Sequence, residues 1–323
     1  MKKKSLEKLK IYIAGHNGMV GKAVVKDLKK VGVKKLITAS RKNLDLLDLE
    51  KLKKFIKINK PDVIINCAGR VGGILANSKF PVQFINENIL IQLNLINCAY
   101  ENNIKHFINL GSSCIYPKNS KQPIKEKYLL SSPLEKTNEA YALAKIIGLK
   151  TCEFYNQQYK TNYFTLMPCN LYGPHDNFDT KNSHFIPALI KKFIESKRKK
   201  TKQVEIWGSG QPKREVMHVD DLANAISYLL KLKVNNDKRL MKILKTDSLI
   251  NIGSGQEFRI KQFAEIINKI FFPKKKLKFN KKFPDGTKRK VLDISIIRKL
   301  GWRSKIKLSE GLRSTINWYK LNY

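Results

Sequence analysis

Two kinds of hydrophobic pattern alternate along the first half of the chain. Short runs such as Val63-Ile64-Ile65 are apolar on both faces, which is typical of strands buried in a parallel sheet. Longer stretches repeat apolar residues every three or four positions, as at Val20, Val24 and Leu28, and predict helices that pack on that sheet. The predicted strands are 9–15, 36–40, 62–68, 105–110 and 162–167, and the predicted helices are 19–30, 49–58, 86–101 and 138–160.

The pattern changes after Asn170. Gly173-Pro174 and a polar loop to Ser183 interrupt the alternation, and no glycine-rich linker marks a separable second domain. Beyond this loop we predict helices at 185–196 and 220–232, a short strand at 204–207, and a strand at 249–253 that rejoins the sheet. The tail, 260–323, contains three more helical stretches.

Together these elements predict an α/β fold, a Rossmann-like doubly wound parallel sheet with a smaller, discontinuous α+β substrate-binding lobe at the C-terminal side. We assign 1–172 and 215–255 to the nucleotide-binding domain, and 173–214 and 256–323 to the lobe. In such a sheet the ligand lies beyond the carboxyl ends of the strands. We therefore look for the chemistry in the loops that follow the strands.

The charge of the chain points first to nucleic acid. It has 64 Lys and Arg against 26 Asp and Glu in 323 residues, a formal net charge of +38. Only 10 of the 64 are Arg, the residue that reads bases and phosphates bidentately, and the Lys are scattered. A coding bias toward Lys, Asn and Ile explains the same pattern, and we favour this interpretation over nucleic-acid binding. We therefore expect no specific nucleic-acid partner.

The cysteines and the N-terminus indicate a cytoplasmic protein. Five Cys, at 67, 98, 114, 152 and 169, form no Cys-x-x-Cys pair and are too few for a disulfide framework, so we expect reduced thiols and no metal site. Met1-Lys2-Lys3-Lys4 resembles the start of a signal peptide, but the first apolar run, 11–14, is too short for one or for a membrane span.

A glycine-rich turn follows the first predicted strand: Gly15-His16-Asn17-Gly18-Met19-Val20-Gly21. Glycines at this spacing let the backbone turn tightly and approach a pyrophosphate, which the N-terminus of the next helix can bind. Since the turn joins a strand to a helix, it favours dinucleotide binding over an ordinary tight turn. At the end of the second strand, Arg41 stands where an acid would bind a ribose hydroxyl, and a cation there favours NADP over NAD.

Candidate catalytic groups follow the fourth strand and lie on the next long helix. The strand ends in Leu110-Gly111-Ser112-Ser113, and the helix carries Tyr141 and Lys145, one turn apart on the same face. In a carbonyl reduction the tyrosine can give a proton to the alkoxide, and the serine can hydrogen-bond the developing oxyanion. We expect the Lys145 ammonium to lower the pKa of Tyr141 by about two units. The alternative is that Tyr141 only packs the helix.

Several longer motifs resemble the GDP-L-fucose synthase family of the extended short-chain dehydrogenase/reductase superfamily. The resemblance runs from about Lys10 to Tyr319. Its motifs are 14–21, Val71-Gly72-Gly73-Ile74, Gly111-Ser112-Ser113-Cys114-Ile115-Tyr116-Pro117, Asn170-Leu171-Tyr172-Gly173-Pro174-His175-Asp176-Asn177, Asn182-Ser183-His184 and Pro284-Asp285-Gly286-Thr287.

The resemblance implies a two-step reaction in one site. The family converts GDP-4-keto-6-deoxy-D-mannose to GDP-L-fucose by epimerising carbons 3 and 5 and then reducing the 4-ketone with NADPH. Inverting a carbon needs a base on one face and an acid on the other, and Cys114 and His184 match the family's epimerisation pair. From the residues alone we would take Cys114 for a small buried filler and His184 for a helix-start residue.

The resemblance also implies binding residues. Toward NADP(H) these are the turn 15–21, Arg41, Lys145, His184 and the segments Leu110, Gly111, Ser112, Ser113 and Pro168, Asn170, Leu171. Toward the GDP-sugar they are Lys192, Trp207, Arg214 and Asp285. In three places the chain departs from the family. Asn17 and Lys192 stand where the family often has a basic residue and an arginine, and Gly69-Arg70 replaces a more apolar stretch.

The family pairs two chains through long helices, which here are 86–101 and 138–160, so we expect a homodimer. A related enzyme that makes GDP-L-colitose is the near alternative. A non-catalytic nucleic-acid or NADP(H)-sensing protein with the same fold is the distant one, because fold does not fix function. Retention of Ser112, Cys114, Tyr141, Lys145 and His184 together argues against it.

Overall fold

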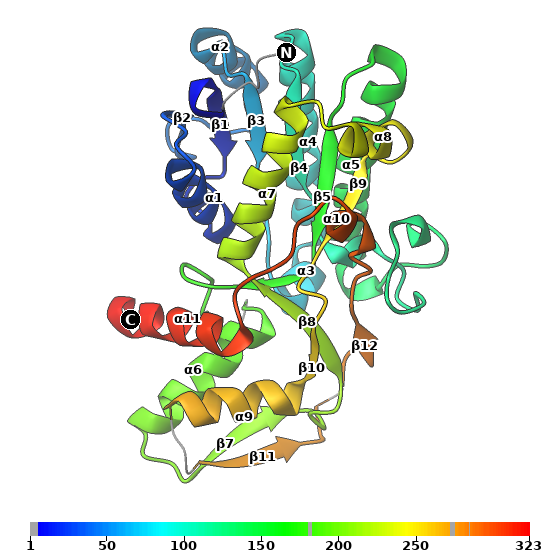
Figure 1. Cartoon of the computed structure of the whole chain (residues 1–323). Coiled ribbons are helices and arrows are strands. Elements are labelled where there is room, and N and C mark those ends of the chain that lie inside the picture. Colours follow the sequence, from blue (N-terminus) through cyan, green and yellow to red (C-terminus); the bar gives the residue numbers. More distant parts are fainter. Residues whose placement is uncertain (1–5, 180–182, 272–274, 284) are drawn as a thin grey trace.

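The computed structural model describes residues 6–179, 183–271, 275–283 and 285–323. A six-stranded parallel sheet forms its larger half, in the order β2-β1-β3-β4-β5-β9 (Figure 1). Strands β1, β3, β4, β5 and β9 have buried apolar residues on both faces, as a parallel sheet between two helical layers requires. Their bounds are Lys10–Ala14 for β1, Lys35–Ile37 for β2, Val63–Asn66 for β3, His106–Leu110 for β4, Phe164–Pro168 for β5 and Leu249–Ile252 for β9.

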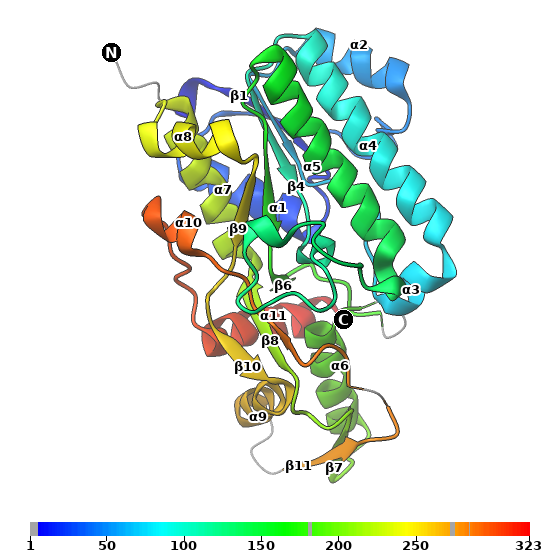
Figure 2. The same cartoon turned by 90° about the vertical axis from the view of Figure 1, so that its right-hand side faces the viewer.

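Helices cover both faces of this sheet (Figure 2). One face carries α1 (Met19–Lys30) and α7 (Val219–Val234), which pack on each other, with α8 (Lys238–Thr246) and α10 (Ser295–Lys299) nearby. The other carries α2 (Leu49–Asn59), α4 (Pro81–Glu101) and α5 (Glu139–Tyr159), with α3 (Ile74–Lys79) at the end of α4. We call this sheet with its helices the nucleotide half.

The remainder, which we call the substrate lobe, has its own hydrophobic core. Strand β8 (Lys213–His218) pairs with β6 (Asn170–Tyr172), β10 (Glu257–Arg259) and β12 (Arg289–Lys290), and β7 (Gln203–Trp207) pairs with β11 (Lys276–Asn280). Helices α6 (Phe185–Arg198), α9 (Ile260–Phe271) and α11 (Leu308–Asn322) pack against these strands (Figure 1). The lobe is built from separate segments of the second half of the chain.

The predicted fold class is confirmed. Helix α1 has the predicted bounds, and the strands of the large sheet begin and end within three residues of theirs. Our prediction missed α3, α8, β6, β8, β10, β11 and β12. The domain boundaries remain a prediction.

No helix among the described residues is both long and apolar enough to cross a membrane. Residues 1–4, Asn182 and Pro284, which belong to motifs named above, lie outside the described residues.

Candidate active site

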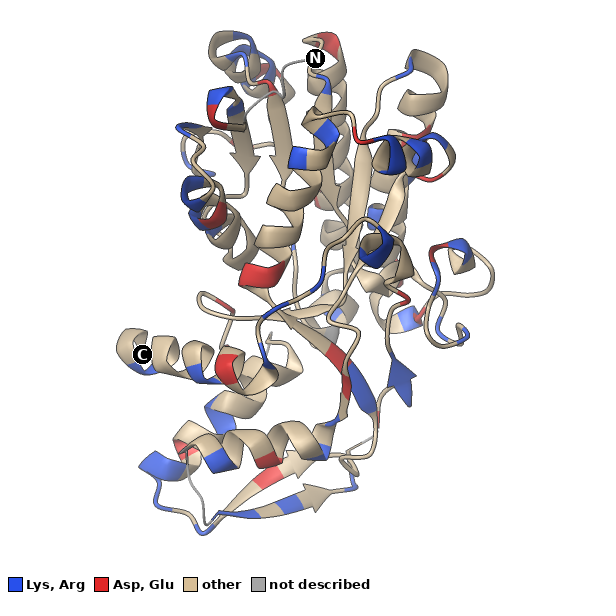
Figure 3. Ribbon diagram, in the orientation of Figure 1, with Lys and Arg blue, Asp and Glu red and all other residues tan. Residues whose placement is uncertain are grey.

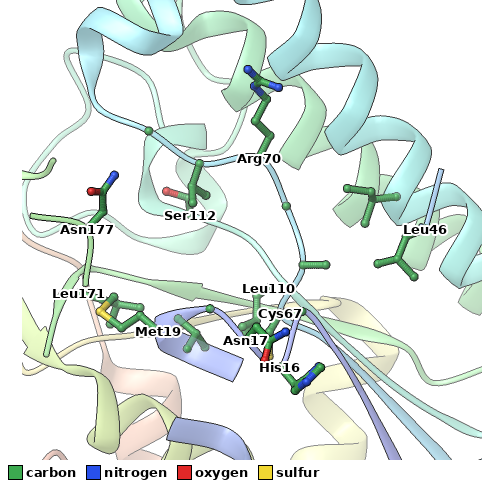
Figure 4. A pocket seen from close by; sticks show the side chains of 18 of the residues that line it. His16, Asn17, Met19, Leu46, Cys67, Arg70, Leu110, Ser112, Leu171 and Asn177 are labelled. Atoms are coloured by element: carbon green, nitrogen blue, oxygen red, sulfur yellow. The ribbon is translucent and has the colours of Figure 1, made fainter. Parts of the chain in front are cut away.

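A cavity of about 630 Å³ lies at the carboxyl ends of the parallel strands, between the nucleotide half and the substrate lobe (Figure 4). The loops after β1, β2, β3, β4 and β5 all contribute to its wall. Of the residues predicted to bind cofactor or react, the wall includes Gly15, His16, Asn17, Gly18, Met19, Val20, Arg41, Leu110, Gly111, Ser112, Tyr141, Lys145, Pro168, Asn170, Leu171 and His184. The ligand position expected for a doubly wound sheet is therefore where the structure has a cavity.

The glycine-rich turn between β1 and α1 fits a dinucleotide. Gly15 has φ +78°, and a Cβ there would lie 2.7 Å from the backbone of Ala68. A Cβ on Gly18 would meet only the Gly15 carbonyl, at 3.6 Å, so this position is open to a ligand. The first turn of α1 has no acidic residue, and its free N–H groups can bind a pyrophosphate. His16 Nδ1 is also buried without a hydrogen-bond partner.

Arg41 lies on the cavity wall, at the end where its predicted 2′-phosphate would bind. Its side chain is 70 % exposed and its Nε is 3.4 Å from Asp45 Oδ2. An exposed pair of this kind is weak, so the guanidinium can leave Asp45 for a phosphate. The neighbouring Lys42 is exposed and is not part of the wall.

Tyr141 and Lys145 lie together on α5, with Ser112 across the same cavity. Lys145 is 3 % exposed, its Nζ donates to the Leu110 carbonyl at 2.9 Å, and it lies 5.7 Å from the centre of the Tyr141 ring. Burial lowers the pKa of Lys145 to about 8 and raises the pKa of Tyr141. The expected lowering of the Tyr141 pKa is therefore wrong, because loss of hydration on burial raises it.

Buried amides hold these elements in register beneath the cavity. Asn66 Nδ2, at the end of β3, donates to Asn109 Oδ1 on β4 at 2.9 Å. Asn109 Nδ2 donates to Gln92 Oε1 on α4 at 3.1 Å, and Gln92 Nε2 donates to the Ala144 carbonyl on α5 at 2.9 Å. This series of hydrogen bonds runs from β3 to α5 and fixes the peptide next to Lys145. Our sequence analysis missed it, although polar residues at the ends of otherwise apolar strands are the signal for it.

Cys114 and His184 occupy different environments. Cys114 is 8 % exposed in the one-turn helix Ser113–Ile115 and, like Ser113, is not part of the cavity wall. Burial raises the pKa of its thiol, and the charge of Lys290 partly opposes this. His184 is open to solvent through the cavity, yet the protein around it still displaces enough water to lower the pKa of its ring. Of the two, only His184 directly lines the cavity.

The residues predicted to bind the GDP-sugar lie in the substrate lobe, outside the cavity wall. Arg214 on β8 is half-buried and donates to the carbonyls of Lys213 and Thr287. Asp285 Oδ1 accepts a hydrogen bond of 2.8 Å from the Ser209 N–H. Lys192 Nζ lies 3.9 Å over the ring of Trp207. The structure thus groups these four residues at the lobe and apart from Tyr141.

Lys290 is a candidate that sequence reasoning missed. It pairs in register with Arg214, so both side chains lie on one face of the β8–β12 pair. On the other face, Lys213 and Arg289 both form ion pairs with Glu257, at 3.3 and 2.7 Å. Among the described residues, neither Arg214 nor Lys290 forms such an ion pair, and two half-buried neighbouring cations suit a diphosphate. The signal in the sequence is adjacent cations in both strands.

Asp176 is a second missed residue. It lines the cavity, is 8 % exposed, and its Oδ2 has no hydrogen-bond partner. The Asn177 N–H donates to Oδ1 at 2.7 Å. Burial nevertheless raises the pKa of Asp176 to about 7, so the carboxyl keeps a proton far above the usual range.

Comparison with known proteins gives a consistent family. The sequence model of the NAD dependent epimerase/dehydratase family matches residues 11–252. The chain is 43% identical over 317 residues to GDP-L-fucose synthase from Escherichia coli, covering 98% of each chain. It is 40% identical to GDP-L-colitose synthase from Yersinia pseudotuberculosis, covering 96% of this chain and 98% of that one.

A solved structure agrees with these sequence relatives. The GDP-mannoheptose C4 reductase from Campylobacter jejuni with NADP bound superposes with a TM-score of 0.86 at 36% identity, over 99% of each chain. The similarity therefore extends through the substrate lobe as well as the nucleotide half.

Proposed function

The chain belongs to the NAD dependent epimerase/dehydratase family, and from that premise we propose that it converts GDP-4-keto-6-deoxy-D-mannose to GDP-L-fucose with NADPH. The observation that carries the proposal is one cavity that joins a dinucleotide-binding turn to Ser112, Tyr141, Lys145 and His184. A GDP-L-fucose synthase at 43% identity over nearly the whole chain supports the substrate class. The motifs shared with that family support the two-step reaction.

The cofactor occupies the wall from the glycine-rich turn to Leu171 in this proposal. Backbone N–H groups at 15–21 bind the pyrophosphate, and Arg41 binds the 2′-phosphate. When bound, NADPH supplies a hydride to the ketone carbon. Gly18 leaves room for the close approach of the pyrophosphate, because no side chain in the described residues occupies the space beside it.

Reduction also needs a proton for the ketone oxygen. Tyr141 keeps its phenolic proton at neutral pH because burial raises its pKa, which is the state that a donor requires. Ser112 can hydrogen-bond the same oxygen from across the cavity. The nearby Lys145 ammonium stabilises the tyrosinate left behind, because unlike charges attract strongly in a site with little water.

Epimerisation needs one acid and one base for each inverted carbon. Burial keeps the proton on the Cys114 thiol and keeps the His184 ring neutral, so the ring is the base and the thiol is the acid. The ring can take the proton from the carbon while the thiol gives its own proton to the opposite face, and exchange with solvent restores both groups before the second carbon is inverted. Lys290 favours the thiolate form of Cys114 through its charge.

The substrate lobe supplies the nucleotide contacts. Arg214 and Lys290 form the diphosphate site, and Lys192 and Trp207 belong to the same lobe. Lys192 offers a point charge where the family has an arginine, so we expect it to bind phosphate with less geometric selectivity. Asp285 orients the adjoining turn through Ser209.

We also propose a homodimer through α4 and α5. These helices pack side by side on one face of the sheet (Figure 2), and both carry exposed apolar side chains. Leu90, Leu143, Ile147 and Phe154 are 46, 37, 37 and 59 % exposed. A second copy would remove this apolar surface from water. Light scattering should give the mass of two chains, and a purely monomeric mass would contradict the proposal.

The surplus of cations takes no part in the proposed reaction. Lys and Arg are spread over both halves of the molecule (Figure 3), and only a few lie at the two ligand sites. We therefore propose no specific nucleic-acid partner. The five cysteines are free, which is compatible with our proposal that the enzyme works in the cytoplasm.

The decisive experiment is incubation with GDP-4-keto-6-deoxy-D-mannose and NADPH, followed by identification of the product sugar. We expect GDP-L-fucose and one NADPH consumed for each product. A GDP-L-colitose synthase is also a relative, so the 3,6-dideoxy analogue is the competing substrate. A strong preference for that analogue would replace fucose by colitose as product, and no reaction with either would contradict the proposal.

A further inference from the structure

Two side chains of its own chain lie against the ring of Trp207. The ring of Phe283 stacks on it with centroids 4.4 Å apart and planes 15° apart. The ammonium of Lys192 lies 3.9 Å over the same ring system. Phe283 and Lys192 thus both lie against the aromatic surface of Trp207.

This arrangement is unusual for a residue at the surface. Trp207 ends β7 on the outward side of the strand and is 54 % exposed. A large aromatic face next to a site for anions suits a nucleobase, which stacks on any aromatic ring. The two half-buried cations of the proposed diphosphate site belong to the same lobe. The stacking position on Trp207, however, is taken by the ring of Phe283.

We propose that Phe283 fills the nucleobase position on Trp207, and that the base of the nucleotide sugar displaces it. This inference rests on the proposed function, since that function supplies a ligand with a purine base. It assigns Phe283 a role that neither the motifs nor the relatives' names give it. Phe283 is then a competitor of the substrate within the enzyme.

The backbone explains why Phe283 moves and Lys192 stays. Strand β11 ends at Asn280, which pairs in register with Trp207, and Phe283 follows in a turn. The ring is 36 % exposed and can swing into solvent without breaking the β7–β11 ladder. Lys192 projects from the middle of helix α6, whose backbone is fixed by the lobe core, and its charge is useful beside a phosphate.

Hydrogen bonds on the far side of the turn limit the movement. Asp285 accepts from both the backbone N–H and the hydroxyl of Ser209, two residues beyond Trp207. The turn is therefore attached to β7 at Asn280 and again at Asp285. Displacement of Phe283 needs a local rotation of its side chain and leaves both attachments in place.

If Phe283 competes with the base, removing each of the two stacked rings should change the affinity for GDP in opposite directions. Removing Trp207 removes the surface on which the base stacks, so Trp207→Ala should weaken GDP binding about tenfold. Removing Phe283 removes only the competitor, so Phe283→Ala should strengthen GDP binding by about three- to tenfold. Phe283→Tyr keeps the stack and should bind GDP as the wild type does.

Isothermal titration of the purified full chain with GDP, and separately with inorganic pyrophosphate, tests this. Pyrophosphate has the anionic groups but no base, so its affinity should be the same for the wild type and for Phe283→Ala. Circular dichroism of each variant shows that it is folded. Weaker GDP binding by Phe283→Ala would mean that the base lies between the two rings, and would overturn the proposal. Unchanged GDP binding would overturn it too.

The pyrophosphate arm and the wild-type titration separate this inference from the proposed function. If the wild type binds GDP and turns over the GDP-sugar, but Phe283→Ala gains no affinity, only the role of Phe283 is wrong. If Phe283→Ala binds pyrophosphate more tightly as well, the gain comes from the phosphate site and the role is also wrong. If the wild type binds no GDP, both proposals are wrong.

Discussion

The nucleotide half and the substrate lobe hold their charged groups in different ways. In the nucleotide half Lys145 is 3 % exposed and already donates to the Leu110 carbonyl, so its position is set before a ligand binds. In the lobe Arg214 and Lys290 are half-buried neighbours, and among the described residues neither has a carboxylate partner. The first arrangement fixes reacting groups, and the second leaves charge available for an anion. Changes in the two regions should therefore affect turnover and affinity separately.

The largest expected effect lies in the nucleotide half. Tyr141→Phe removes the only proton that this side chain can give to the ketone oxygen, so kcat should fall by about a hundredfold to ten-thousandfold. The KM for the GDP-sugar should change little, because the substrate's charged groups bind in the lobe. The measurement is NADPH oxidation at saturating substrate.

Tyr155→Phe is the matched control for Tyr141→Phe. Tyr155 lies on the same helix, but its hydroxyl donates to Asn97 Oδ1 at 2.7 Å. It is not part of the cavity wall. Near-normal NADPH oxidation by Tyr141→Phe, or an equal loss in both variants, would refute the role of Tyr141 as proton donor.

The next effect belongs to the lobe. Arg214→Ala should raise the KM for the GDP-sugar by about tenfold to a hundredfold, because hydrogen bonds to a charged group contribute about 1.5–3 kcal/mol. The control is Lys213→Ala, the preceding residue, whose ammonium points to Glu257 instead. A fall in kcat without a rise in KM would contradict the idea that the lobe determines affinity and the nucleotide half determines turnover.

The two regions also differ in how well their sequence predicts their structure. Helix α1 and the strands of the large sheet could be predicted because their apolar residues are buried on both faces or repeat with a helical period. Strand β8 could not, because Lys213 and Arg214 open it and its partners are two- or three-residue strands far away in sequence. Such strands exist through tertiary pairing, and no local pattern encodes them.

Functional residues, like strands, could be predicted from the sequence only where the signal is local. The glycine-rich turn and the Tyr141-Lys145 pair could be located from spacing, since each depends on a single turn or helix. Lys290 and Asp176 could not, because their importance depends on long-range neighbours: Arg214 for Lys290 and the cavity wall for Asp176. The direction of the Tyr141 pKa also failed, since the spacing gives the charge nearby but not the loss of water.

Asp176 lies in the cavity between the two regions, and its raised pKa can be tested through the pH dependence of stability. Its pKa is raised to about 7 from 3.8, so between pH 4 and 7 the folded protein binds more protons than the unfolded chain, and stability falls as pH rises. Asp176→Asn removes this loss. The free energy of unfolding of Asp176→Asn minus that of the wild type should therefore be larger at pH 8 than at pH 4. The increase in this difference should be on the order of 1–3 kcal/mol.

Urea unfolding of the ligand-free protein at the two pH values measures this difference. Asp48 provides a contrast, because its hydrogen bonds with Lys51 lower its pKa and its contribution is lost as pH falls. Asp48→Asn should consequently show a pH dependence of the opposite sign. The same pH profile for Asp176→Asn and the wild type would show that the carboxyl is ionised in the folded protein.

The smallest expected effect is at Arg41. This cation of the nucleotide half resembles those of the lobe, because it is available for an anion and should affect affinity alone. Its side chain is 70 % exposed and its pair with Asp45 is weak, so Arg41→Ala should reduce NADPH affinity by only about two- to fivefold. NADH lacks the 2′-phosphate, so its affinity should stay the same, and Lys42→Ala should affect neither cofactor because Lys42 is not part of the cavity wall. Fluorescence titration of both cofactors measures the ratio. Equal losses for NADPH and NADH would show that Arg41 supports the loop rather than the phosphate, and that cofactor preference comes from other residues.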